Sequence, residues 1–305
     1  MVAKKNIAVL IPCLNEEKTI SNVIKKIKAK VHQADVFLFD NDSTDDSKHL
    51  AKKAGAIVFN VTKKGKGNVV RKMFSEISAD IYIMIDGDDT YDVENINEMI
   101  DLLQRDSLDM VVAKRVSNDT SAYRFGHKTG NRIFTNLVKY TFGNQIDDLF
   151  SGFRIFSRQF VKSFPCNSIG FEIETELTIH ALEQRLDVVE VECLYFARPS
   201  GSESKLKTFG DGFKILNLIL ILIKDEKPFL FFSLLSLFFL FSSLFIGLPV
   251  VFEFLNTGLV DRLPTAVLSG INMVIAFLSF FSGLILDVVK KSRHEMKRLT
   301  YLSNK

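Results

Sequence analysis

The stretch Ile81-Tyr82-Ile83-Met84-Ile85-Asp86-Gly87-Asp88-Asp89-Thr90 joins a short apolar run to a cluster of carboxylates. The apolar half is rich in isoleucine, a β-branched residue, and therefore predicts a buried strand. Gly87 allows a sharp turn after that strand and separates Asp86 from Asp88 by one small residue. Carboxylates held so close repel each other unless a cation lies between them. A hard divalent ion suits this position, because it takes oxygen ligands and shares its coordination with phosphates.

A solvated acidic turn that caps a helix is the alternative interpretation of the same residues. The rest of the chain favours the metal site. Buried strands are expected at residues 7–12, 36–40, 56–61 and 81–85, with a helix after each of the first three, and further strands at residues 110–113 and 188–193. This alternation predicts an α/β fold with a mostly parallel sheet and helices on both faces. Ligands of such sheets bind just outside the carboxyl ends of the strands, which is where the acidic turn is expected.

Polar side chains follow three of these strands, at residues 15–17, 40–43 and 86–88. Because the carboxyl ends of parallel strands share one edge, the three groups are expected to converge on one crevice. A fourth group, Lys63, Lys64, Lys66 and Arg71, surrounds two glycines at the entry to a helix. Such an entry suits a diphosphate, although a simple loop is the alternative.

Composition excludes several classes of protein. The net charge of +3 with 25% charged residues indicates neither a nucleic-acid binder by charge nor a disordered tail. The three cysteines are odd in number and widely scattered, so a reducing compartment is expected rather than a disulfide framework or a zinc site. Up to about residue 206 the composition is that of a soluble domain, whereas apolar residues dominate beyond it.

Four ordered motifs resemble those of family 2 glycosyltransferases of the GT-A fold. They are Ile11-Pro12-Cys13-Leu14-Asn15-Glu16, Phe39-Asp40-Asn41-Asp42-Ser43-Thr44-Asp45, Gly65-Lys66-Gly67 and Asp86-Gly87-Asp88. The resemblance implies a Rossmann-like GT-A domain and a UDP- or GDP-linked sugar donor. It further implies that Asp86 and Asp88 hold Mg²⁺ or Mn²⁺ against the diphosphate. The implied donor contacts are Pro12, Asn15, Glu17, Asp40, Asp42, Lys66, Arg71, Asp86, Gly87 and Asp88. Asn41 and Asp42 stand where an Asp and often a Gly are usual, so the base preference stays open.

The segment Asp147-Asp148-Leu149-Phe150-Ser151-Gly152-Phe153-Arg154 is similar to the Asp-x-x-Ser-Gly-Phe-Arg segment of polyprenyl-phosphate glycosyltransferases, the subfamily of dolichol-phosphate mannose synthase. The resemblance implies that Arg115, Arg132 and Ser151 bind a lipid phosphate. It also implies that Asp148 lines the sugar site and is catalytic together with Asp86 and Asp88. For the two arginines, a solvated helix face near acidic lipid is the alternative.

A second loop is similar to the Arg-x-x-Gly-x-Ser-Lys loop of the same subfamily, but it is one residue longer. It reads Arg198-Pro199-Ser200-Gly201-Ser202-Glu203-Ser204-Lys205. Arg198 and Lys205 are its candidates for contact with the diphosphate, since a mobile loop with glycine, hydroxyls and cations suits closure over phosphate. Glu172 and Glu174 begin a further helix, where acidic residues are favourable without any function. Both can alternatively face sugar hydroxyls.

The apolar C-terminal part predicts membrane attachment. We expect a GT-A domain over residues 1–206, an interfacial helix over 207–227, a hairpin of two transmembrane helices over 228–290 and a basic tail over 291–305. Each long apolar run exceeds the roughly 20 residues that span a bilayer. Because positive charge flanks the cytoplasmic ends of spans, the catalytic domain and both termini are expected in the cytoplasm. A buried hairpin of a soluble protein is the alternative.

Together these features predict a metal-dependent, inverting transfer of sugar from a nucleotide-diphosphate sugar to an undecaprenyl or dolichyl phosphate. The product would be a polyprenyl-phosphate monosaccharide. The alternatives are transfer to a diacylglycerol, a protein or a growing polysaccharide, and a catalytically silent membrane scaffold. Processive synthases resemble this chain less, because their Gln-x-x-Arg-Trp motif needs a tryptophan and the chain has none. No nucleic-acid partner is expected; small residues in the apolar runs hint at packing between spans and at a possible homo-oligomer.

Overall fold

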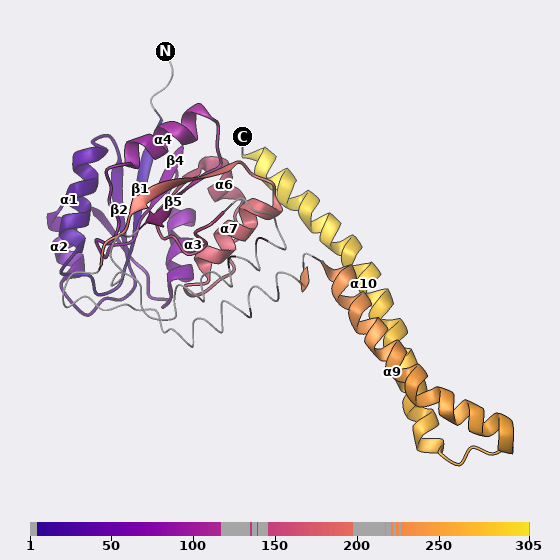
Figure 1. The fold of residues 1–305 in the computed structure, drawn as a ribbon. Coiled ribbons are helices and arrows are strands. Elements are labelled where there is room, and N and C mark those ends of the chain that lie inside the picture. The colour runs from indigo at the N-terminus through magenta and orange to yellow at the C-terminus, as the bar shows by residue number, and fades with distance from the viewer. Residues whose placement is uncertain are drawn as a thin grey trace. The chain divides into compact units, whose positions relative to one another are not determined.

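The computed structural model describes residues 5–116, 135, 139, 146–197, 217, 221, 224–225 and 227–304. Two compact units are formed. The first comprises Met1–Ile219 with Lys297–Lys305, and the second Leu220–Met296. The first unit is an α/β domain, and the second consists mainly of two long helices (Figure 1).

A mixed sheet of seven strands, counted over the described residues, is the centre of the first unit, with the order β3-β2-β1-β4-β6-β5-β7. β6 is antiparallel to its neighbours β4 and β5, and the other pairs are parallel. The prediction of a mostly parallel α/β sheet is thus confirmed, while β6 lies outside the predicted strands. The strands are β1 (Ile7–Cys13), β2 (Asp35–Asp40), β3 (Ile57–Asn60), β4 (Ile81–Met84), β5 (Met110–Val116), β6 (Arg154–Ser157) and β7 (Val188–Leu194).

Helices cover both faces of the sheet. Successive side chains of a strand point to opposite faces, and nearly all side chains of β1 and β4 are buried. On one face, Ile7, Val9 and Ile11 of β1 form a continuous core with the apolar stripes of α1 and α4 and with Ala51 of α2. On the other face, Phe74 of α3 packs edge-on against Tyr82 and Phe156. The first set is α1 (Ile20–Lys30), α2 (Ser47–Lys53) and α4 (Ile96–Arg105), and the second is α3 (Lys66–Glu76), α6 (Arg158–Ser163) and α7 (Ile173–Glu183).

The carboxyl end of β1 lies at the point where the strand order reverses. The chain proceeds outward from β1 to β2 and β3 and then returns to β4 on the other side of β1. Open α/β sheets bind ligands at such a point. The three strand ends do meet there, since the Asn15 N–H donates to Ser43 Oγ at 2.9 Å and Thr19 Oγ1 donates to the Gly87 carbonyl at 2.7 Å.

The second unit is built from α9 (Pro228–Thr257) and α10 (Leu263–Ser303), both long and apolar enough to cross a membrane. In the apolar 18-residue stretch of each helix, only 6% of α9 and 22% of α10 is buried. A core helix of a soluble protein would be mostly buried. Ser243 Oγ donates to the Ser269 carbonyl at 2.8 Å, and Ser269 Oγ donates back to the Ser243 carbonyl at 3.0 Å. A Cβ on Gly247 would lie 2.3 Å from Ser269 Oγ. Small and hydroxyl-bearing residues of this kind let helices pack closely in an apolar solvent.

The last two turns of α10 belong to the first unit. Lys297 Nζ lies 2.6 Å from a carboxylate oxygen of Glu183, and the Tyr301 hydroxyl donates to Asp109 Oδ1 at 2.8 Å. The sequence predicts a transmembrane hairpin that ends at residue 290 and a separate tail at residues 291–305. In the structure, the single helix α10 continues through this boundary to Ser303. The predicted interfacial helix at residues 207–227 lies almost entirely outside the described residues. The other predicted boundaries stay predictions.

Replacing Tyr301 with phenylalanine is expected to lower the free energy of unfolding by about 1–3 kcal/mol at neutral pH, because it removes a hydrogen bond to the buried carboxylate of Asp109 and leaves only the Ser157 hydroxyl, at 3.1 Å, on the same oxygen. Burial raises the pKa of Asp109, so this carboxyl group favours the fold at low pH and loses that contribution as the pH rises through its raised folded-state pKa. Tyr301 supports the ionised form. The deficit of the variant is therefore expected to shrink as the pH is lowered, as measured by urea unfolding followed by circular dichroism. A deficit that does not change with pH would contradict this account.

Candidate functional site

The acidic turn that follows β4 directs its carboxylates to two different places. Asp88 is 3% exposed, and its Oδ1 accepts the Thr90 hydroxyl at 2.6 Å. The side chain of Asp86 is 25% exposed and reaches Lys66 Nζ at 2.6 Å. Asp89 instead contacts α1, where it accepts from Lys26 at 2.8 Å and Asn22 at 2.6 Å. Of the three carboxylates, Asp86 is thus engaged by Lys66, Asp88 by Thr90 and Asp89 by α1.

Lys66 joins this turn to a helix that is distant in sequence. Its ammonium lies 2.6 Å from Asp86 Oδ1 and 2.5 Å from Glu174 Oε1 on α7, and all three side chains are at least three-quarters enclosed. Burial alone lowers the pKa of Lys66, but the two carboxylates outweigh burial and hold its pKa above the ordinary value. Lys66 is therefore a permanent cation of this site.

Close approach of the chain to itself explains three glycines around the site. A Cβ on Gly152 would lie 2.2 Å from Asp86 Oδ2. A Cβ on Gly65 or Gly67 would lie 2.3 or 2.2 Å from a carbonyl oxygen of the loop before α7. The Gly67 N–H donates to the Gly170 carbonyl at 3.1 Å and the Asn68 N–H to the Ile169 carbonyl at 3.3 Å. The predicted phosphate cradle at this helix entry is thus occupied by a neighbouring loop, and Lys66 reaches the crevice through its side chain.

Arg71, a predicted donor contact, holds the same loop. Its Nε and Nη2 donate to the Cys166 carbonyl at 2.9 and 2.7 Å, and Nη2 also reaches the Asn167 carbonyl at 3.3 Å. Glu176 completes the arrangement by accepting the N–H groups of Asn167 and Ser168 at 2.9 and 2.7 Å. In this structure Arg71 therefore fixes the loop that packs on the start of α3.

Asp40 ends β2 as a fully buried carboxylate. Its Oδ2 accepts the Ser43 N–H at 3.1 Å and lies 3.2 Å from Lys48 Nζ, while Oδ1 has no hydrogen-bond partner among the described residues. A buried acceptor without a donor is costly and indicates a place for a ligand N–H or O–H. The predicted contact of Asp40 with the donor stays a prediction.

The neighbouring residues of the first two strand ends mostly organise the turns. Asn15 adopts a positive φ of 53° and accepts the Thr44 N–H at 2.8 Å, and Glu17 accepts the Asp46 N–H at 3.1 Å. Asp42, with φ 65°, is exposed. Pro12 lies in β1 opposite Phe39 of β2.

Asn41, one of the two departures from the family pattern, has a structural explanation. Its amide nitrogen donates to the carbonyls of Val61 and Lys63 at 3.0 and 2.8 Å, and its oxygen accepts the Gly65 N–H at 2.7 Å. An ionised aspartate cannot donate the first two bonds. The amide therefore ties the end of β2 to the segment that leads into α3.

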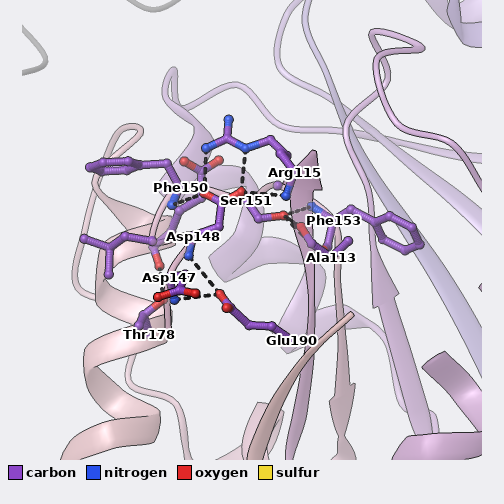
Figure 2. Close-up of polar contacts among 12 residues, drawn as sticks. Ala113, Arg115, Asp147, Asp148, Phe150, Ser151, Phe153, Thr178 and Glu190 are labelled. Carbon is purple, nitrogen blue, oxygen red and sulfur yellow. Dashed lines mark hydrogen bonds and ion pairs between the residues drawn. The ribbon is translucent and has the colours of Figure 1, made fainter. Parts of the chain in front are cut away.

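Figure 2 shows the second predicted group, in which the Arg115 guanidinium faces the carboxylate of Asp148. Nε and Nη2 of Arg115 each donate to one carboxylate oxygen at 2.7 Å, and the backbone N–H of Arg115 adds a third bond at 3.1 Å. The pKa of Asp148 lies below its ordinary value because Arg115 outweighs the effect of burial. Arg115 also lies over the Tyr195 ring, 5.4 Å from its centroid. Two donors of Arg115 are thus engaged by Asp148 rather than presented to an acceptor phosphate.

The loop that carries Asp148 is fixed from below by Glu190 of β7, which accepts the N–H groups of Asp147 and Asp148 at 2.9 and 2.8 Å (Figure 2). Ser151 is completely buried and donates to the Ala113 carbonyl at 2.7 Å. The Ser151 hydroxyl therefore supports the end of β5 in this structure and is not exposed to a lipid phosphate, the ligand predicted for it. Arg132, Arg198 and Lys205 lie outside the described residues.

The carboxylates of the turn after β4 are of the type that a divalent cation prefers. The Lys66 ammonium balances one of the two negative charges of Asp86 and Glu174. The other charge and that of Asp88 together give two negative charges for a divalent ion. No group of three or more His, Cys, Asp or Glu side chains arranged for a metal occurs in the part of the chain that the structure describes. Mg²⁺ is typically held by only one or two carboxylates, with substrate phosphates and waters completing its shell. Asp86 and Asp88 are accordingly the residues that would hold it.

Comparison with known proteins finds a matching family model and several relatives. Residues 8–164 match the family model described as glycosyl transferase family 2. An uncharacterized protein of Shigella flexneri is 50% identical over 157 residues, which are 52% of this chain and 96% of that protein. Glycosyltransferase AglJ of Haloferax volcanii is 29% identical over 97% of this chain and 98% of its own length. A dolichyl-phosphate hexose transferase of the same organism is 26% identical over 73% of this chain and 96% of its own length.

A solved structure supports the fold. Glucosyl-3-phosphoglycerate synthase from Mycobacterium tuberculosis, in complex with Mn²⁺, UDP-glucose and phosphoglyceric acid, superposes with a TM-score of 0.59 and 22% sequence identity. The superposition covers 72% of this chain and 80% of that protein. The GT-A-like architecture of the first unit is thereby established.

Proposed function

This chain belongs to glycosyl transferase family 2, and from that premise we propose that it moves a sugar from a nucleotide-diphosphate donor onto the phosphate of a polyprenyl lipid. One observation carries the proposal: a single chain combines acidic residues at the strand ends where the strand order reverses with two helices apolar enough for a bilayer. The enzyme is a glycosyltransferase, and the proposal concerns its donor, metal and acceptor.

The donor is proposed to lie across the ends of β1, β2 and β4. The buried Oδ1 of Asp40 has no hydrogen-bond partner among the described residues, and we assign it to a base or ribose donor group that would have to displace its cover. The Lys66 ammonium is a cation beside the expected diphosphate. Asp86 and Asp88 would hold Mg²⁺ or Mn²⁺, which when bound neutralises charge on the departing diphosphate. A UDP-linked sugar with Mn²⁺ is the combination in the structural relative, whose fold this chain shares.

The acceptor is proposed to be a phosphate carried by a membrane lipid. Relatives named for dolichyl phosphate include the hexose transferase of Haloferax volcanii, which this chain matches over 96% of its length. A phosphate monoester is largely ionised at neutral pH, because its second pKa is about 6. It is therefore a ready nucleophile, and the protein has little need of a general base. Family resemblance implies in-line attack with inversion at the anomeric carbon.

Membrane anchoring is proposed to bring the enzyme to this acceptor. α9 and α10 would cross the bilayer as a hairpin, with Lys290, Lys291 and Arg293 following the second apolar run. Positive residues favour the cytoplasmic side, which would place the catalytic unit in the cytoplasm. A hairpin also explains how a water-insoluble acceptor and a soluble donor meet on one enzyme.

The test is to incubate membranes that contain the enzyme with a mixture of nucleotide sugars and to analyse the extracted lipids by mass spectrometry. We expect one new species whose mass equals a polyprenyl phosphate plus one glycosyl residue (a sugar less one water), and which releases the sugar in mild acid. A sugar found only on diacylglycerol or on protein would reject the proposed acceptor.

A further inference from the structure

The Lys66 ammonium contacts Asp86, one of the two residues proposed to hold the divalent metal ion. The ammonium is 2.6 Å from Asp86 Oδ1, which makes this a short, charge-assisted hydrogen bond. The lysine side chain is only 9% exposed, so solvent does little to weaken the pair.

An ammonium and a divalent ion cannot share Asp86 Oδ1 at these distances without strong repulsion, because both are cations in a largely enclosed site. Lys66 has a second partner, however. Glu174 Oε1 lies 2.5 Å from the same ammonium, and its side chain is 8% exposed. The ammonium can thus give up Asp86 and still remain paired within the site.

We propose that Lys66 is a resident cation which competes with the divalent metal for Asp86, and that Glu174 retains the ammonium when the metal binds. The inference rests on the proposed metal role of Asp86 and Asp88, and it goes beyond that role by assigning an exchange between two cations. Lys66 keeps Asp86 compensated before the metal arrives, and this compensation weakens the metal site in the absence of substrate.

Binding of Mn²⁺ to the full-length protein in detergent, measured without nucleotide by the electron paramagnetic resonance of free Mn²⁺, tests the competition. Lys66→Met removes the competing charge and nearly keeps the side-chain length. We expect Mn²⁺ to bind this variant about tenfold more tightly or better, since one unit charge next to the ligand oxygen is lost. Lys72→Met is the matched control, because Lys72 lies on the same helix and pairs with Glu76 at the surface. Its Mn²⁺ affinity should equal that of the wild type. Unchanged or weaker binding by Lys66→Met would overturn the proposal.

A measurement on the wild type covers the case in which Lys66→Met does not fold. A water-soluble carbodiimide joins amines to carboxylates in contact, and the linked peptides are identified by mass spectrometry. Without metal, links from Lys66 to both Asp86 and Glu174 are expected. Mn²⁺ should suppress the link to Asp86 and preserve the link to Glu174, whereas equal suppression of both links, or none, would overturn the exchange.

The outcomes separate this inference from the proposed function. If Mn²⁺ binds the wild type and Lys66→Met binds it no better, the competition fails while the metal role stands. If neither protein binds Mn²⁺, both the competition and the metal role fail. Competition together with a product other than a glycosylated lipid phosphate would reject the proposed acceptor alone.

Discussion

Replacing Asp88 with asparagine is expected to lower the turnover number of sugar transfer about 1000-fold, because metal stabilisation of a leaving diphosphate is worth several kcal/mol. Asparagine keeps the side-chain shape and the Oδ1 acceptor that receives the Thr90 hydroxyl at 2.6 Å. The substitution therefore removes a charge from the metal site with little change to the turn. Initial rates with a radiolabelled nucleotide sugar and polyprenyl phosphate measure the effect.

Asp89→Asn is the matched control for this experiment. Asp89 belongs to the same turn, but its carboxylate pairs with Lys26 of α1 at 2.8 Å and is 14% exposed. Asparagine also tolerates its positive φ of 57°. This variant should keep a turnover number close to that of the wild type. Near-normal transfer by Asp88→Asn would remove the metal role of that residue.

Replacing Gly152 with alanine is expected to reduce turnover about 100-fold, since small displacements of catalytic groups have effects of this size. A Cβ at this position would lie 2.2 Å from Asp86 Oδ2 and 3.0 Å from Oδ1. Either the carboxylate or the chain at Gly152 must then move. The proposed metal site would be displaced without the loss of any polar group.

Circular dichroism and the Mn²⁺ affinity distinguish displacement from unfolding of the Gly152→Ala variant. A folded variant with weakened Mn²⁺ binding and low turnover is the expected result. Gly270→Ala serves as the control, because no atom lies within 4 Å of a Cβ built there. Full activity of Gly152→Ala would mean that sugar transfer does not depend on the observed position of the Asp86 carboxylate.

Local sequence patterns were sufficient to predict the sheet and the convergence of its strand ends. The isoleucine-rich run before Asp86 and the similar runs before residues 15 and 40 become buried strands because β-branched side chains fit a sheet covered on both faces. Parallel strands bring their carboxyl ends to one edge, so the polar residues after them had to meet. The strand β6 escaped prediction because its four residues continue directly from a loop motif.

The partners within the crevice were not predictable in the same way. Lys66 and Glu174 are 108 residues apart, and an acidic residue at a helix start is already explained by the helix dipole. Sequence suggested Glu174 only as a possible sugar contact. The glycines at positions 65 and 67 suggested a phosphate cradle, whereas they admit the carbonyls of a loop from elsewhere in the chain. A glycine in the sequence can indicate that another group packs closely on the backbone, but it does not indicate whether that group is a ligand or another part of the chain.

Arg115 and Ser151 show the same difficulty for the predicted acceptor site. The resemblance suggested phosphate contacts for both, but the charge of Arg115 is met by Asp148 and the Ser151 hydroxyl by a carbonyl within the sheet. Side chains near a site can maintain the loops that carry other residues. Their roles depend on contacts across 33 and 38 residues of chain, which no local pattern encodes.

Transfer of labelled sugar by the purified full-length enzyme to polyprenyl phosphate, compared with the corresponding polyprenol, tests the central claim most directly. The account predicts label in the phosphate-bearing lipid, released by mild acid, and none in the alcohol, because the ionised phosphate is the nucleophile. Equal labelling of the alcohol, or label that appears only in an acid-stable glycolipid, would contradict it.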